Sequence, residues 1–126
     1  MPTTAEIVAE YFAAIRAMDA DRWVNIFAPD AVTHDPVGTP PVVGHEALRQ
    51  FITSINTNFK MVSLTENGVF VCGNSAAAKW IGQASTHTGK SVTFEGIDVI
   101  DTNDEGKITL VRAFWDPTPL FAALQD

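Results

Sequence analysis

Cysteine is almost absent from this sequence: Cys72 is the single one among 126 residues. One cysteine cannot form an intrachain disulfide, and such a chain suits a reducing compartment. Long apolar stretches are missing as well, since no run approaches the ~18 residues that a membrane span requires. The N-terminus lacks the basic and then apolar pattern of a signal peptide. These absences predict a cytoplasmic protein that does not contact a membrane.

Basic residues are also scarce. The chain has eight Lys and Arg against 15 Asp and Glu, and its formal net charge is −7. A nucleic-acid surface needs clustered positive charge, so nucleic acid is not an expected partner. The three histidines, His34, His45 and His87, stand far apart, and no Cys/His spacing typical of a zinc site occurs. The sequence therefore predicts no metal site.

The first half of the chain has helical patterns. Thr3–Glu6 forms a capping box, and the apolar residues after it recur at helical spacing to about Met18. A second short helix is expected to continue through Phe27 until Pro29 stops it. Gly44 opens a third helix with one apolar face. Three helices are therefore expected before the first long strand.

The second half changes to strand patterns that are joined by turn residues. Glu66-Asn67-Gly68 predicts a first hairpin, and His87–Lys90 and Asn103–Gly106 predict two further turns. The expected strands span Lys60–Leu64, Val69–Cys72, Ala76–Ala84, Ser91–Asp101 and Lys107–Trp115. Helices followed by hairpin-linked strands predict an α+β fold in one domain, residues 1–126. In it, a curved, mixed or antiparallel sheet packs on the three N-terminal helices.

A stiff loop carries the first candidate catalytic residue. A short strand over Ala31–His34 delivers Asp35 to a loop in which Pro36, Pro40 and Pro41 restrict the backbone. A stiff loop holds its side chains in few orientations, as a catalytic group requires. An Asp before Pro also caps turns, so the local sequence leaves both roles open.

Two further polar groups stand among apolar residues. Tyr11, the single tyrosine, lies within the apolar stripe of the first helix, so its hydroxyl needs a partner in the interior. On the strand Ser91–Asp101, alternation places Asp98 on the same face as Phe94 and Ile100. A buried carboxyl without a cationic neighbour keeps its proton, because desolvation raises its pKa. A solvated face with a salt bridge at Asp98 is the alternative.

Apolar residues also occupy the opposite face of the expected sheet. Ile97 and Val99 lie there on one strand, and alternation adds Ile108, Leu110 and Phe114 on the last strand. A sheet that is apolar on both faces needs a second cover. A homodimer partner is the simplest one.

Tyr11, the loop Asp35–Pro41 and the pair Ile97-Asp98 together resemble the Δ5-3-ketosteroid isomerases of the NTF2-like, or SnoaL-like, superfamily. The resemblance covers nearly the whole chain and implies an NTF2-like cone. It implies that Asp35 is the general base, which moves a proton between two carbons of a steroid without a cofactor. It also implies that Tyr11 and a protonated Asp98 donate hydrogen bonds to the substrate carbonyl; ketosteroid isomerase is itself the known example of a carboxylic acid kept neutral by an apolar site.

The resemblance extends to the pocket wall, with departures. Trp115 matches a pocket-wall aromatic of part of the family, and Val111 shares its face, although both also suit a packed core. Phe27 and Phe94 complete the expected substrate-binding set. Many members support the pocket tyrosine with further tyrosines, and Phe27 and Ile52 take those places here. Tyr11 therefore has no second tyrosine that could hydrogen-bond to its hydroxyl.

The leading interpretation is a steroid Δ-isomerase-like enzyme that acts on an apolar ketone, a hydrophobic small molecule, through a dienolate. A SnoaL-type polyketide cyclase is an alternative, since such enzymes also use an acidic base for carbanion chemistry. Epoxide hydrolases of the superfamily have an Arg-x-Asp arrangement on this strand, and Gly96 stands here where that arginine would be. A dimeric ligand-binding module is the third alternative, but it has no need of an ionisable base opposite two proton donors.

Overall fold

The computed structural model describes residues 1–125. Its elements, in chain order, are α1 (Thr4–Ala17), α2 (Ala20–Val24), β1 (Phe27–His34), β2 (Val42–Val43), α3 (Gly44–Asn58), β3 (Met61–Cys72), β4 (Ser75–Ser85), β5 (Ser91–Thr102), β6 (Ile108–Trp115) and α4 (Thr118–Leu124). None of the helices in this described part is long and apolar enough to cross a membrane.

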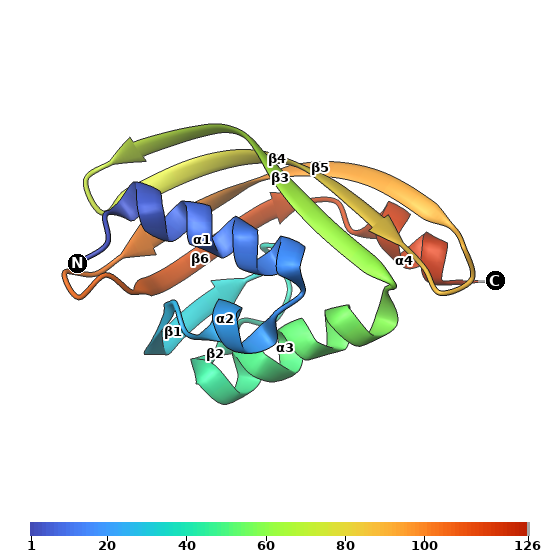
Figure 1. The fold of residues 1–126 in the computed structure, drawn as a ribbon, viewed down its shortest axis with the longest axis horizontal. Coiled ribbons are helices and arrows are strands. Elements are labelled where there is room, and N and C mark those ends of the chain that lie inside the picture. Colours follow the sequence, from blue (N-terminus) through green and yellow to red (C-terminus); the bar gives the residue numbers. More distant parts are fainter. Residues whose placement is uncertain (126) are drawn as a thin grey trace.

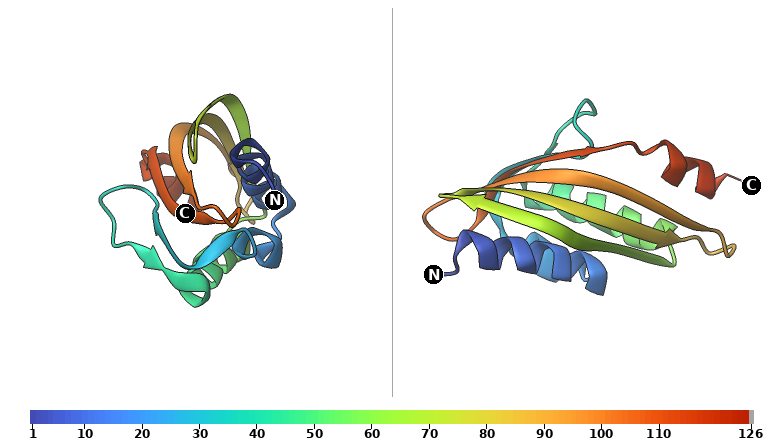
Figure 2. Two further views of the ribbon diagram at one scale, coloured as in Figure 1. Left: turned by 90° about the vertical axis from the view of Figure 1, so that its left-hand side faces the viewer. Right: turned by 90° about the horizontal axis from the view of Figure 1, so that it is seen from above.

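A six-stranded sheet arches over α1, α2 and α3 (Figure 1). Its strand order is β2-β1-β6-β5-β4-β3, and every neighbouring pair is antiparallel except β1 and β6, which are parallel. Seen from one end, the sheet curls around the interior while the helices close the open side (Figure 2). The fold is therefore a mixed α+β cone on three N-terminal helices, as the sequence predicts.

The start of α1 follows its capping box. The Thr3 hydroxyl accepts from the Glu6 backbone N–H at 3.1 Å, and the Glu6 carboxylate accepts from the Thr3 N–H at 2.9 Å. The helix buries Ile7, Tyr11 and Ile15 on one face. Met18 ends it in the left-handed conformation, with φ of 53°. Local sequence thus determines both the length of α1 and the face that carries Tyr11.

The second helix is shorter than the sequence suggests. It ends at Val24, and Phe27 begins β1, which carries Pro29. The prediction of a helix through Phe27 is therefore wrong. Phe27 is 1% exposed and pairs with Ile108 of the parallel strand, so sheet pairing overrides the local helical pattern.

The predicted hairpin at Glu66-Asn67-Gly68 is also wrong. Strand β3 continues through these residues to Cys72, and its register with β4 shifts between Glu66 and Val69. Gly68 has a positive φ of 119°, which suits a β-bulge as well as a turn. The actual turn lies at Gly73, where φ is 60°.

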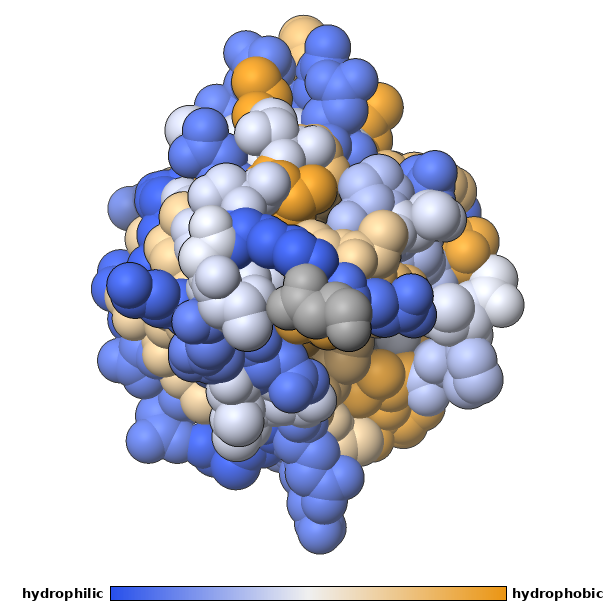
Figure 3. All heavy atoms as spheres, turned by 90° about the vertical axis from the view of Figure 1, so that its right-hand side faces the viewer, coloured by the Kyte–Doolittle hydropathy of each residue, from blue (hydrophilic) through white to orange (hydrophobic). Residues whose placement is uncertain are grey.

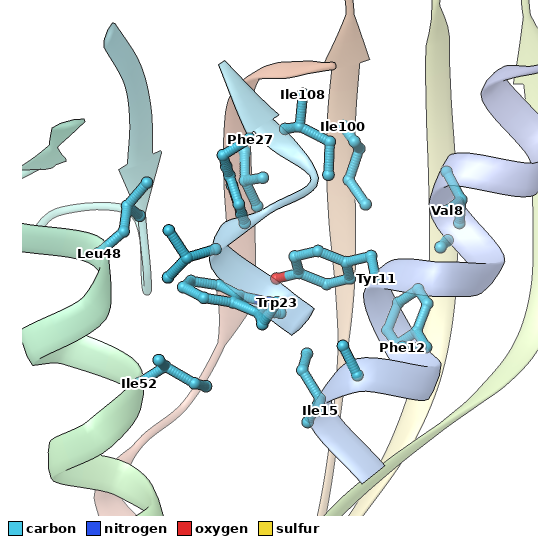
Figure 4. Close-up of a cluster of buried hydrophobic side chains, with 14 of the residues drawn as sticks. Val8, Tyr11, Phe12, Ile15, Trp23, Phe27, Leu48, Ile52, Ile100 and Ile108 are labelled. Atoms are coloured by element: carbon cyan, nitrogen blue, oxygen red, sulfur yellow. The ribbon is translucent and has the colours of Figure 1, made fainter. Parts of the chain in front are cut away.

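A second irregularity changes the parity of β6. Thr102 pairs with Ile108 while Asp101 pairs with Leu110, so one extra residue stands between these pairs. As a result Ile108 is fully buried, beside Phe27 and Ile100 (Figure 4), and is not on the outer face. Alternation is regular after the bulge, and Phe114 is 44% exposed there.

Candidate active site

A largely apolar cavity lies between the inner face of the sheet and the three N-terminal helices. It contains about 570 Å³ of empty space, including the part open to solvent. Its lining residues are Tyr11, Ile15, Trp23, Asp35, Phe51, Ile52, Ile55, Asn56, Val62, Leu64, Trp80, Phe94, Asp98, Trp115 and Leu120. No lysine, arginine or histidine is among these described lining residues. The cavity therefore suits an uncharged, mainly hydrocarbon ligand.

Tyr11 supplies the hydroxyl group from α1. Its side chain is 1% exposed, and its ring packs among Phe12, Trp23 and Phe27 at centroid distances of 5.1, 6.0 and 6.2 Å (Figure 4). Burial first, and then the nearby Asp98 and Asp35 carboxyls, raise the pKa of Tyr11 well above its usual value. The hydroxyl consequently keeps its proton and can act as a hydrogen-bond donor.

Asp98 supplies a carboxyl from the inner face of β5. It is 1% exposed, and Trp80 Nε1 donates to its Oδ1 at 2.9 Å. Burial and the charge of Asp35 raise the pKa of Asp98 to about 7, although hydrogen bonds from Trp80 and Tyr11 oppose this rise. Below neutral pH, Asp98 is therefore a neutral acid with one proton to donate.

Asp35 lies on the loop after β1, in a half-buried position. The backbone N–H of Val37 donates to the carbonyl of Ala113 at 2.8 Å, which fastens this loop to β6. Two residues farther along β6, Trp115 Nε1 donates to Asp35 Oδ1 at 2.6 Å. Burial raises the pKa of Asp35, and the indole hydrogen bond opposes that rise.

The two carboxyls form an electrostatic pair. Each lies where ionisation is costly, and the charge of Asp35 favours the protonated form of Asp98. Such a pair titrates as a unit and holds one proton over an interval of pH. In that interval the cavity contains one carboxylate and two O–H donors, which is the set of groups that proton transfer next to a carbonyl requires.

The structure brings together five of the seven residues that the sequence suggests for the site. Tyr11, Asp35, Asp98, Phe94 and Trp115 all line the cavity.

The remaining two, Val111 and Phe27, do not line the cavity. Val111 is fully buried opposite Ile100, and Phe27 packs behind Trp23 with ring centroids 4.6 Å apart. Both belong to the hydrophobic core. Core packing is therefore the role that the structure supports for both side chains.

Sequence reasoning missed Trp80, which lies on β4 next to Asp98. The signal that could have found it is alternation, since Ala76, Ala78 and Trp80 point inward together. Trp80 pairs with Gly96 across the strands, and Gly96 pairs in turn with Trp115. A Cβ at Gly96 would lie 2.6 Å from Cζ2 of Trp80 and 2.7 Å from Cβ of Trp115. Glycine is therefore the residue that lets both indoles lie over β5.

A second, wider groove opens beside the cavity, between α3 and α4. It has about 1100 Å³ of empty space, including open solvent, and shares with the cavity the residues Asp35, Phe51, Ile55, Trp115 and Leu120. Apolar side chains gather on the end of the molecule that carries α4 (Figure 3). Phe121, which lines this groove, is 58% exposed.

The residues that the structure describes hold no group of three or more His, Cys, Asp or Glu side chains that could bind a metal ion.

The family model for the SnoaL-like domain matches residues 8–111. The chain is 32% identical to a steroid Delta-isomerase from Nocardioides simplex over 111 residues, which cover 87% of each chain. It is 30% identical to SalBIII, an epoxide hydrolase/cyclase-like enzyme of pyran ring formation in the polyether salinomycin, with a TM-score of 0.83 over 92% of both chains. Rv0760c from Mycobacterium tuberculosis, solved with estradiol-17β-hemisuccinate, has a TM-score of 0.84 over 94% of this chain and 98% of its own. At 19% identity, it shares the fold.

Proposed function

This chain belongs to the SnoaL-like family of the NTF2-like superfamily, and we propose that within it the protein is a steroid Δ-isomerase-like enzyme. It moves a proton between two carbons of an apolar ketone through a dienolate. The observation that carries this proposal is that the carboxyl groups of Asp35 and Asp98 and the hydroxyl of Tyr11 all line a single apolar cavity.

Asp35 is the proposed general base. Trp115 occupies its Oδ1, which leaves the other oxygen to accept a carbon-bound proton and to return it to a different carbon. No cofactor takes part, because the same carboxylate removes and returns the proton. Burial raises the pKa of Asp35, which makes its carboxylate a stronger base than that of a solvated aspartate.

Tyr11 and Asp98 are the proposed donors to the substrate oxygen. Removal of the proton moves negative charge onto that oxygen, and two preorganised donors in a dry site stabilise this charge better than water does. The donors come from α1 and β5, two elements held together by the core, so their geometry is fixed before substrate binds.

The proposed substrate is a neutral ketone with a large hydrocarbon body. The absence of cations from the described lining, together with the aromatic cluster of Trp80, Phe94 and Trp115, favours flat apolar rings. The similarity to a steroid Delta-isomerase supports a 3-oxosteroid.

The test is the isomerisation of 5-androstene-3,17-dione, followed by the ultraviolet absorbance of the conjugated enone. We expect turnover by the purified protein and a loss of about 10²- to 10⁴-fold in Asp35→Asn, the range for a general base. The affinity for the steroid product should remain, since an asparagine side chain has nearly the same shape as an aspartate. Binding of steroid without turnover by the wild-type protein would instead support a binding module.

A cyclase is the second candidate, because SalBIII is nearly as similar to this chain as the isomerase is. An acid and a base that line one cavity could also add a substrate hydroxyl to an enone. The assay that separates the two is product analysis: a hydroxy-enone that forms a ring, with no movement of a steroid double bond, favours the cyclase. Gly96 gives no support to an Arg-x-Asp epoxide hydrolase.

A homodimer and a cytoplasmic location are further parts of the proposal. Ile81, Ile97 and Phe114 are 39%, 44% and 44% exposed on the outer face of the sheet, where a second copy would cover them. Light scattering should give about twice the mass of one chain, and Ile97→Lys should lower it to that of one chain. A wild-type monomer would refute the dimer.

A further inference from the structure

Each of the three tryptophans presents its indole N–H differently. Trp115 Nε1 donates to Asp35, and Trp80 Nε1 donates to Asp98. The buried Nε1 of Trp23 has no hydrogen-bond partner within residues 1–125. Packing alone does not require a tryptophan at position 80, because a phenylalanine ring is also apolar and presents no donor.

The indole of Trp80 is held firmly. It is 1% exposed, and its ring contacts Phe94 edge-on, with centroids 5.6 Å apart and planes at 82°. The ring of Trp115 lies 6.2 Å from that of Trp80 and 5.5 Å from that of Phe94, so the three aromatic rings form one packed cluster. Gly96 provides the space under the ring, since a Cβ there would lie 2.6 Å from Cζ2 of Trp80. The donor therefore has a fixed direction.

A fixed donor determines where the proton of Asp98 lies. A protonated carboxyl has one O–H, and its other oxygen only accepts. Because the Trp80 N–H already points at Oδ1, that oxygen is the acceptor and the proton belongs on Oδ2. If the carboxyl turned by about 180°, its O–H would point at the Trp80 N–H, and a buried donor would have no acceptor. The turned orientation is therefore less populated by about tenfold or more.

Two ionisable groups face Asp98, namely Tyr11 from α1 and Asp35 from the loop after β1. On the two strands beside it, Asp98 pairs with Ala78 of β4 and Ala113 of β6, which carry no charge. Tyr11 also hydrogen-bonds the Asp98 carboxyl, and Trp80 is the donor that reaches its Oδ1 from the neighbouring strand.

We propose that Trp80 is a positioning residue that fixes the Asp98 carboxyl, so that its proton-bearing oxygen faces the substrate oxygen in the cavity. Its catalytic consequence rests on the proposed isomerase function. The orientation itself can be tested without turnover.

The first experiment follows the three indole N–H resonances of ¹⁵N-labelled wild-type protein between about pH 4 and about pH 9, a range that spans the ionisation of buried aspartates. The Trp80 signal should shift as Asp98 ionises, and the Trp115 signal should shift as Asp35 ionises. The Trp23 signal is the internal control and should shift least. Asp98→Asn should remove the titration of the Trp80 signal. A Trp80 signal that behaves like that of Trp23 overturns the proposal.

The second experiment measures the pH profile of isomerisation in Trp80→Phe, which keeps an aromatic ring and removes the donor. The high-pH limb should move upward by about one pH unit, because the ionised form of Asp98 loses a hydrogen bond. We expect kcat to fall about tenfold with KM nearly unchanged, since the carboxyl can now turn. An unmoved high-pH limb contradicts the proposal.

Trp115→Phe is the matched control, and it should move the low-pH limb upward, because Asp35 loses its donor. If the wild-type protein has no isomerase activity while the Trp80 resonance follows Asp98, the proposed function fails and the orientation of Asp98 stands.

Discussion

Replacement of the buried acid Asp98 by asparagine should stabilise the protein and remove its activity. Asparagine has nearly the same shape, and its oxygen can still accept from Trp80 Nε1. Its amide can donate to the Tyr11 hydroxyl. The variant therefore keeps the local packing and removes the cost of placing a charge in an apolar cavity.

The magnitude follows from the pKa of Asp98, about 7 in the folded chain against an ordinary 3.8. The folded chain holds this proton to higher pH than the unfolded chain does. Proton binding at Asp98 therefore stabilises the folded wild-type protein fully below about pH 4, and this stabilisation is lost as the pH rises through about 7. At ~1.36 kcal/mol per pKa unit the whole effect is on the order of 4 kcal/mol, of which about 3 kcal/mol falls between pH 5 and pH 8.

The assay is urea denaturation of the wild-type protein and Asp98→Asn at about pH 5 and about pH 8, because proton binding by Asp98 is coupled to folding over this range. The free energy of unfolding of the wild-type protein should fall by about 3 kcal/mol more than that of the variant. Asp30→Asn, the same substitution at an exposed site, is the control. Equal pH dependence in the wild-type protein and Asp98→Asn would refute the view that Asp98 is a neutral buried acid.

Tyr11→Phe should lower kcat about 10²- to 10³-fold, because the developing oxyanion loses one hydrogen-bond donor. Steady-state kinetics measure this, and a kcat near that of the wild-type protein would contradict the role of Tyr11. Gly96→Ala should cost roughly 1–3 kcal/mol by overpacking against Trp80 and Trp115; a melting temperature equal to that of the wild-type protein would contradict the close approach. Val111→Ala should cost roughly 2 kcal/mol in urea denaturation and leave KM unchanged, because the side chain lies in the core. A raised KM with unchanged stability would return Val111 to the cavity wall.

Local sequence signals predicted the positions of the polar groups well. Helical spacing after the Thr3–Glu6 capping box predicts the buried face that carries Tyr11, and alternation on β5 predicts the inward direction of Asp98. Both signals depend on residues a few positions apart, so they survive in the folded chain.

Signals that depend on register were less informative. Gly68 suits a bulge and a turn equally, and only the pairing of Glu66 and Val69 with β4 on either side of it distinguishes the two. One extra residue before Leu110 reverses the expected face of Ile108. The hydrogen bond from Trp80 to Asp98 joins strands whose alignment is set by the turn between them, so no local pattern contains it.

The most direct test of the account is a crystal structure of the protein with a phenolic steroid, whose ring oxygen resembles the oxygen of the dienolate. We expect this oxygen to accept hydrogen bonds from both the Tyr11 hydroxyl and Asp98 Oδ2, with the Asp35 carboxylate next to the first two rings of the steroid. A steroid bound with that oxygen toward solvent, or held only in the groove between α3 and α4, would contradict it.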